Sequence, residues 1–276
     1  MSGKTAWPIG WVACVCGIWI ASALLGGTRP GYAAEPGHVL NNVIPELVDC
    51  RQVIVVTTTR WNSVSAQLAC FERTTPESAW HCALPPSPAV IGRNGLAWGI
   101  GLHGTNPPDE AIKREGDGCT PAGVFSLEEA FGYATPGEAA VQNFPYRHVT
   151  NTVEGIDDPA SRYYNRLIDA TRVTKDWRSS EQMLREDGAY RWGVVIQHNW
   201  KPYPGYGSCI FLHGWSGSDQ PTAGCTALPL DKVKAIIRWL DKKKRPFLVQ
   251  LPANEYDRWK RAWLLPEHAS PAGGVE

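Results

Sequence analysis

The chain has no net charge, because its 27 basic and 27 acidic residues cancel over 276 residues. Without a basic excess there is no electrostatic footprint for nucleic acid and no polybasic patch for an anionic membrane surface. We therefore expect neither nucleic acid nor a membrane surface as a partner.

The sequence also lacks internal repeats, low-complexity tracts and an interdomain linker. A chain of this length can bury one sizeable core, or two modest ones, without metals or disulfides. We expect one domain over residues 45–255 and a monomer. Residues 256–276 are expected to form a peripheral helix and a disordered tail.

The N-terminus has the pattern of an export signal. Lys4 precedes an apolar stretch over residues 11–25, and small residues follow it. We interpret residues 1–34 as a secretory signal peptide, with the mature chain starting near Ala34 or Glu35 and no stable membrane insertion after cleavage. A retained anchor is the alternative, since the stretch is close to the lower limit of about 17 residues for a span. A lipoprotein signal is disfavoured because Cys14 and Cys16 lie early inside the apolar run rather than after it.

Most of the remaining chain has the signals of strands. "VIVVTTT", "SVSAQLACFE" and "AWHCAL" predict a hairpin turning at "TTPES", and "LAWGIGLHG", "AGVFSL", "GVVIQH", "CIFLH" and "FLVQLP" predict further strands. Helical spacing is found in "LDKVKAIIRWLDKK", and shorter helices are predicted at "SSEQMLRED" and "NEYDRWKRAWLL". The fold class is therefore mainly β with a few helices.

Six cysteines follow the predicted signal, which allows three disulfides, or fewer with reactive thiols. They are Cys50, Cys70, Cys82, Cys119, Cys209 and Cys225. If the first hairpin turns at "TTPES", Cys70 and Cys82 lie opposite one another, and we expect a disulfide between them.

The stretch "CIFLHGWSGSDQPTAGCTAL", residues 209–228, brackets a polar loop with His213 and Cys225. A histidine can take the proton of a thiol, and the resulting imidazolium stabilises the thiolate. A glycine beside the nucleophile, here Gly224, permits close backbone approach to an acyl group and to a developing oxyanion. The pattern predicts a thiol nucleophile, while a disulfide remains the structural alternative for Cys225.

A metal site would use His213, His198 and Cys225, but the sequence has no close ligand pair and no His-x-x-x-His helix. We expect no metal and no cofactor. His198 is interpreted as a core or rim histidine, and Asp117 as a turn residue that caps its own backbone.

"IFLHGW" followed by "TAGCTAL" resembles the catalytic motif of the YkuD-like L,D-transpeptidases, and the upstream "KREGDGCTPAGVFSLEEAFGY" resembles the same family's Thr-Pro-x-Gly-x-Phe element. The resemblance covers roughly residues 53–252, and "DDPASRYYNRLID" with "DWRSSEQM" resembles an exported branch. It implies a β-sandwich or barrel catalytic domain that acts on peptidoglycan stem peptides in the periplasm or cell wall.

The resemblance also implies roles for individual residues. Cys225 would be the acylated nucleophile, His213 its general base oriented by a backbone carbonyl, and Gly224 with Cys225 the source of oxyanion donors. Thr222 occupies the family's Ser/Thr position.

The substrate site implied by the resemblance includes Thr222, Gly214 and Ala223. The chain departs from the family pattern at Ala223, where many relatives have a second histidine, and at Ala227, where they have Arg or Asn.

The long aromatic-rich region over residues 131–191 is interpreted as a functional cover or binding wall, with Trp177, Tyr164 and Asn165 as candidates for the groove. A surface elaboration without a role is the alternative. The expected activity is thioester-dependent L,D-transpeptidation. An L,D-carboxypeptidase with the same nucleophile and an inactive wall-binding module are the rivals.

Overall fold

The computed structural model describes residues 43–104 and 111–267. The predicted signal peptide over residues 1–34 and the end of the predicted tail lie outside the described residues. Among those described, no helix is both long enough and apolar enough to span a membrane.

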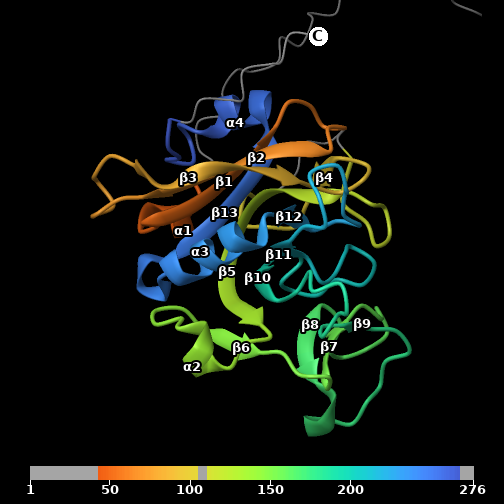
Figure 1. The fold of residues 1–276 in the computed structure, drawn as a ribbon. Coiled ribbons are helices and arrows are strands. Elements are labelled where there is room, and N and C mark those ends of the chain that lie inside the picture. The colour runs from red at the N-terminus through yellow and green to blue at the C-terminus, as the bar shows by residue number, and fades with distance from the viewer. Residues whose placement is uncertain (1–42, 105–110, 268–276) are drawn as a thin grey trace, which may run out of the picture. The chain divides into compact units, whose positions relative to one another are not determined.

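The fold is a sheet that closes on itself (Figure 1). Its strands are hydrogen-bonded in the order β10-β11-β12-β3-β2-β1-β13-β5, and β10 pairs back onto β5. Short strands β4 and β6 add to β5. The strand bounds are β1 Gln52–Thr58, β2 Ser65–Glu72, β3 His81–Val90, β4 Leu96–Trp98, β5 Thr120–Gly132, β6 Tyr146–His148, β10 Trp192–Ile196, β11 Phe211–Gly214, β12 Thr226–Leu228 and β13 Pro246–Pro252. The prediction of a mainly β, barrel-like fold is confirmed.

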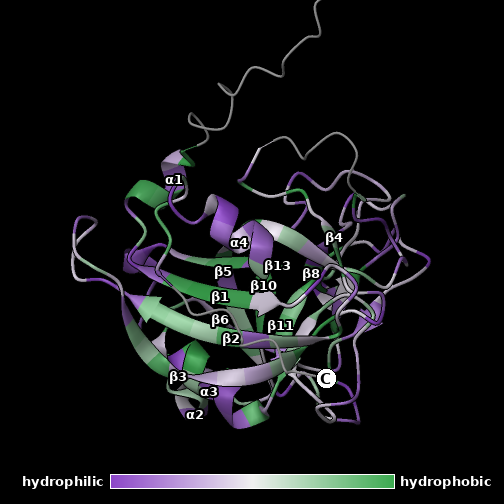
Figure 2. Cartoon of the chain, turned by 90° about the horizontal axis from the view of Figure 1, so that it is seen from above, coloured by the Kyte–Doolittle hydropathy of each residue, from purple (hydrophilic) through white to green (hydrophobic). Residues whose placement is uncertain are grey.

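β1 lies in the middle of this sheet because its β-branched run has apolar neighbours on every side. All seven residues of β1 are buried, as are all seven of its parallel partner β13. Figure 2 shows the hydrophobic colouring along β1. Continuous burial on both faces favours an unbroken β-branched run over alternation.

The predicted hairpin forms from β2 and β3, but the predicted disulfide does not. Next to the turn the register pairs Phe71 with Cys82 and Glu72 with His81, and a bulge beyond this point pairs Cys70 with Leu84, so the two cysteines do not lie opposite one another. Cys70 is buried and Cys82 is exposed, and all six cysteines of the described chain are free. The prediction of a Cys70–Cys82 bond is therefore wrong, because spacing alone does not reveal a one-residue slip.

Helix α3 (Leu230–Trp239) confirms the helix predicted from apolar spacing, and it packs Val233, Ile236 and Ile237 into the core. Helix α4 (Ala253–Trp259) also packs inward, burying Tyr256 and Trp259. The remaining helical elements are single turns: α1 Pro45–Val48, α2 Pro136–Ala139, η1 Ala170–Arg172 and η2 Lys242–Lys244.

A second, three-stranded sheet lies within the region between β5 and β10. It has the order β8-β7-β9, with bounds β7 Val153–Ile156, β8 Arg166–Asp169 and β9 Glu181–Gln182. The predicted helix "SSEQMLRED" is wrong, because this segment pairs with β7 as β9. The hydroxyl of Ser179 donates to Asp157 at 2.6 Å, and that of Ser180 donates to Glu154.

Candidate active site

The two ends of the polar loop are brought together by parallel pairing of β11 and β12. The register sets Leu212 opposite Thr226 and His213 opposite Ala227. Because side chains alternate along a strand, Cys225 and His213 lie on one face of the sheet, and Leu212 lies on the other. The motif residues therefore share a surface that the sequence spacing only permitted.

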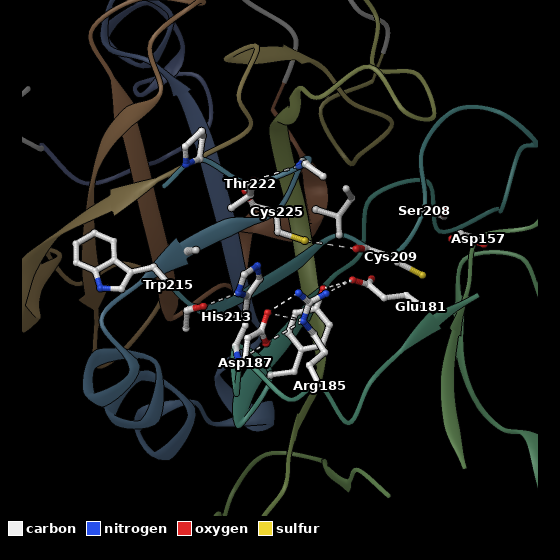
Figure 3. Close-up of a pocket in the computed structure, with 18 of the residues that line it drawn as sticks. Asp157, Glu181, Arg185, Asp187, Ser208, Cys209, His213, Trp215, Thr222 and Cys225 are labelled. Atoms are coloured by element: carbon white, nitrogen blue, oxygen red, sulfur yellow. Dashed lines mark hydrogen bonds and ion pairs between the residues drawn. The ribbon is translucent and has the colours of Figure 1, made fainter. Parts of the chain in front are cut away.

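Cys225 and His213 line one cavity of about 630 Å³. Six of the predicted site residues border it: Cys225, His213, Gly224, Thr222, Gly214 and Ala223. Figure 3 shows the imidazole of His213 directed toward the Cys225 side chain. The cavity thus brings a thiol and a base together.

The ring of His213 is fixed by two contacts. Its Nδ1 lies 2.8 Å from the carbonyl oxygen of Gly214, and the ring of Tyr190 packs edge-on with centroids 5.1 Å apart. A carbonyl only accepts, so Nδ1 carries the hydrogen and Nε2 keeps a lone pair. A backbone carbonyl orients the imidazole, as the family resemblance implies.

Burial keeps both the imidazole and the thiol neutral. It lowers the pKa of His213 to about 4 and raises the pKa of Cys225 to about 12, with Glu181 adding to the latter shift. Desolvation disfavours both charged forms, so burial favours a neutral thiol beside a neutral imidazole over a thiolate–imidazolium pair.

The Cys225 thiol is held by backbone groups. Its Sγ accepts from the N–H of Phe211 at 3.3 Å and lies 3.5 Å from the carbonyl oxygen of Cys209. With Cys209 accepting the S–H, proton transfer to His213 requires the thiol to turn away from that carbonyl.

Two threonine hydroxyls brace the carbonyl of Cys225. Thr222 Oγ1 donates to it at 2.6 Å and Thr120 Oγ1 at 3.1 Å. Each hydroxyl also accepts a backbone N–H, from Gly224 at 3.1 Å and from Gly92 at 2.8 Å respectively. Thr120 begins the Thr-Pro-x-Gly-x-Phe element, so the two motifs meet at the nucleophile.

The Gly224 N–H, an expected oxyanion donor, is engaged by Thr222. Glycine suits the close packing here, since a Cβ at residue 224 would lie only 3.1 Å from the carbonyl oxygen of Cys119. At Gly214 a Cβ would lie 2.6 Å from Leu230 of α3. Both glycines therefore permit close packing around the site.

One wall of the cavity comes from β9 and the segment between β9 and β10. It contributes Glu181, Arg185, Asp187 and Tyr190. Arg185 forms an ion pair with Asp187, and the Tyr190 hydroxyl donates to Glu181 at 2.5 Å. Part of the region over residues 131–191 thus borders the cavity. The charged residues of this wall were not singled out from the sequence, because the segment was predicted as a helix.

Four other candidates lie outside the cavity lining, where they support structure. Trp177 is buried and its Nε1 donates to Glu154 at 2.7 Å. Tyr164 donates to Glu115 at 2.5 Å, and Asn165 accepts the N–H of Cys209 at 2.9 Å. His198 is buried, with Nε2 2.8 Å from the Tyr206 carbonyl oxygen, as expected for a core histidine.

Asp117 has the turn role expected of it. Its carboxylate accepts the backbone N–H groups of Cys119 at 2.8 Å and Arg114 at 2.6 Å. In the described chain no cluster of three His, Cys, Asp or Glu side chains is arranged to hold a metal ion.

The model of the YkuD L,D-transpeptidase catalytic domain matches residues 65–249, and the chain belongs to this family. Comparison with curated proteins finds no match. A similar solved structure is the crystal structure of the helical cell shape determining protein Pgp2 from Campylobacter jejuni, at 14% identity and a TM-score of 0.34. The match covers 80% of this chain and 50% of that chain, so this chain spans about half of that protein's length.

Proposed function

We propose that the protein is a cysteine-dependent L,D-transpeptidase acting on peptidoglycan stem peptides through a thioester. The observation that carries the proposal is the fixed tautomer of His213. Its Nδ1–H is taken by Gly214, so Nε2 is the basic nitrogen in the cavity that also holds Cys225.

Acylation begins with attack of Cys225 Sγ on the carbonyl carbon of the bond before the terminal D-alanine, while the thiol proton moves to His213 Nε2. The tetrahedral intermediate collapses as the C–N bond breaks, and His213 returns the proton to the leaving amine. The products are a thioester on Cys225 and free D-alanine.

The deacylation step distinguishes an L,D-transpeptidase from an L,D-carboxypeptidase. An amine that attacks the thioester gives a cross-link and restores the thiol, which is transpeptidation. Water gives a shortened peptide acid, which is carboxypeptidation. We place the amine first, following the family, with water as the rival acceptor.

The proposed oxyanion donor is the N–H of Cys225 itself, because the Gly224 N–H is engaged by Thr222. Gly224 then acts by letting the loop pack closely. Thr222, Gly214 and Ala223 are proposed as substrate contacts because they line the cavity. Trp177 has no such support, since it lies outside the lining.

An inactive wall-binding module is the second candidate, and its support is Ala223, which stands where many relatives have a histidine. The proposed substrate lies outside the inner membrane, so we also propose export by the N-terminal signal and action in the periplasm or cell wall, as a monomer.

The test is intact-protein mass with a tetrapeptide donor, with and without an added amine. A Cys225 adduct followed by cross-linked product supports transpeptidation, and shortened peptide alone supports carboxypeptidation. A protein that binds peptide but never gains the acyl mass, including after exposure to a carbapenem, would be a binding module.

A further inference from the structure

Two cationic side chains line the cavity within the described chain, and they differ in availability. The Lys113 side chain is 3% exposed, and its ammonium lies 2.5 Å from the carboxylate of Asp117. The Arg185 side chain is 39% exposed. A solute in the cavity therefore meets the guanidinium of Arg185 rather than the ammonium of Lys113.

The guanidinium of Arg185 has donors to spare. Its Nε lies 3.0 and 3.1 Å from the two carboxylate oxygens of Asp187, Nη2 donates to Asp187 at 2.5 Å, and Nη1 donates to Glu181 at 3.4 Å. A guanidinium has five N–H bonds, so one on each Nη has no partner among the described residues. Two N–H groups of one planar fork match the two oxygens of a carboxylate.

The segment around Arg185 is held in place before any solute arrives. Tyr133 accepts the backbone N–H of Arg185 at 2.8 Å and donates to its carbonyl at 3.1 Å. Asp187 in turn accepts the N–H of Ala189 at 3.0 Å. A guanidinium held by a fixed carboxylate loses little conformational entropy when it binds a ligand.

The charge of the Arg185–Asp187 pair does not change at working pH. Their hydrogen bonds raise the pKa of Arg185 and lower the pKa of Asp187 to about 2. Asp187 offsets the positive charge without covering the two remaining N–H groups. The pair therefore presents a directional donor site.

Arg185 also lies near the reacting groups. Its charge acts on both His213 and Cys225, and Figure 3 shows it on the same side of the cavity as His213. In the proposed donor, the free carboxylate is one residue beyond the bond that breaks, a length of about 3.3–3.6 Å.

We propose that the two free N–H groups of Arg185 bind the terminal carboxylate of the donor peptide, so that Arg185 selects donors with a free C-terminus. This inference rests on the proposed function for the position of the scissile bond. It predicts that a donor ending in a carboxamide is bound less well, because one oxygen and the negative charge are lost.

The test uses binding, so that it does not depend on turnover. The mature Cys225→Ala protein is titrated by calorimetry with two tetrapeptides that end in D-alanine, one as the free acid and one as the carboxamide. We expect the acid to bind about 10- to 100-fold more tightly, the range for charge-assisted hydrogen bonds.

Adding Arg185→Gln should remove this preference by weakening the acid alone, with the carboxamide unchanged within about twofold. Arg185→Lys keeps the charge without the fork and should retain part of the preference. The Arg185→Lys variant also tests the proposal if Arg185→Gln unfolds the protein. Arg172→Gln is the matched control, because Arg172 forms a similar exposed ion pair with Asp169 outside the cavity lining. It should change neither affinity.

Equal binding of the two peptides, binding of neither, or equal losses in the Arg185 variants would each overturn the carboxylate site. The same two donor peptides, incubated with the protein that keeps the Cys225 thiol, distinguish a failure of the carboxylate site from a failure of the proposed function. An Arg185-dependent preference without an acyl-enzyme refutes the transpeptidase and keeps the site. An acyl-enzyme that forms equally from both donors supports the thioester mechanism and refutes the carboxylate site.

Discussion

The two sides of the cavity are held by different kinds of contact. On the strand side, Cys225 and His213 are fixed by backbone groups and are kept neutral by burial. On the wall formed by β9 and the segment after it, Arg185 and Asp187 are more exposed, charged and held mainly by one another. The strand side is suited to bond making and the charged wall to selecting the ligand. Mutations of the reacting groups on the strand side should therefore have the largest effects.

Cys225→Ala should have the largest effect, because it removes the only atom that forms the proposed thioester. Acyl-enzyme and product should be absent by mass spectrometry, while the thermal unfolding midpoint stays close to that of the parent. Full turnover by this variant would contradict the thioester mechanism.

His213→Ala should lower the acylation rate by about 10² to 10⁴, the usual contribution of a general base. This rate is measured by rapid mixing of the protein with donor peptide, followed by quantification of the acyl-enzyme over time. A variant within twofold of the parent would show that another group takes the thiol proton.

Thr120→Val should come next, since it leaves the Gly92 N–H without its buried acceptor and removes one brace from the Cys225 carbonyl. We expect a loss of about 1–3 kcal/mol in the free energy of unfolding and an acylation rate lower by up to about 10².

Thr57→Val is the matched control for Thr120. Its hydroxyl is also buried in a strand but has no hydrogen-bond partner among the residues that the structure describes. Chemical denaturation should show little or no destabilisation. Equal losses in the two variants would mean that the Thr120 hydrogen bonds have no special role.

The pH dependence sharpens the contrast between the neutral pair and an ion pair. His213 is unprotonated above a pKa of about 4 and Cys225 is protonated below about 12. The acylation rate should therefore be flat between roughly pH 6 and 9 and should fall only when His213 gains its proton. Alkylation by iodoacetamide, which needs the thiolate, should instead rise with pH over that range.

The same shift affects stability on the acid side. The folded chain resists protonating His213, whereas the unfolded chain binds that proton below its ordinary pKa of about 6.5. Stability should thus be lost as the pH falls from that value toward the folded pKa of about 4. Chemical denaturation at several pH values would show this loss. An acylation rate that changes between pH 6 and 9, or a free energy of unfolding that stays constant as the pH falls below about 6.5, would contradict a neutral, buried His213.

Ala223→His should have the smallest effect on acylation, because Cys225 and His213 are already in place. We expect a change in the choice between amine and water acceptors, measured as the ratio of cross-linked to shortened peptide. A large gain in the acylation rate itself would show that the parent site lacks a needed group.

How far the sequence predicts this molecule differs between the same two sides. The strand side follows from local patterns: the apolar run before His213, the glycine before Cys225, and strand alternation that places both on one face. The charged wall depends on non-local pairing, since Glu181 joins β7 across the chain and its segment resembles a helix in isolation. The Cys70–Cys82 prediction fails for a related reason, because the register in which β2 and β3 pair has no local signal.

The most direct test is to locate the acyl group formed from a tetrapeptide donor. The protein is quenched in acid and digested, and the peptides are sequenced by mass spectrometry with and without hydroxylamine, which cleaves thioesters. We expect one hydroxylamine-sensitive adduct on Cys225, absent from Cys225→Ala and strongly reduced in His213→Ala. A stable adduct on another residue, or none while product accumulates, would contradict the thioester mechanism.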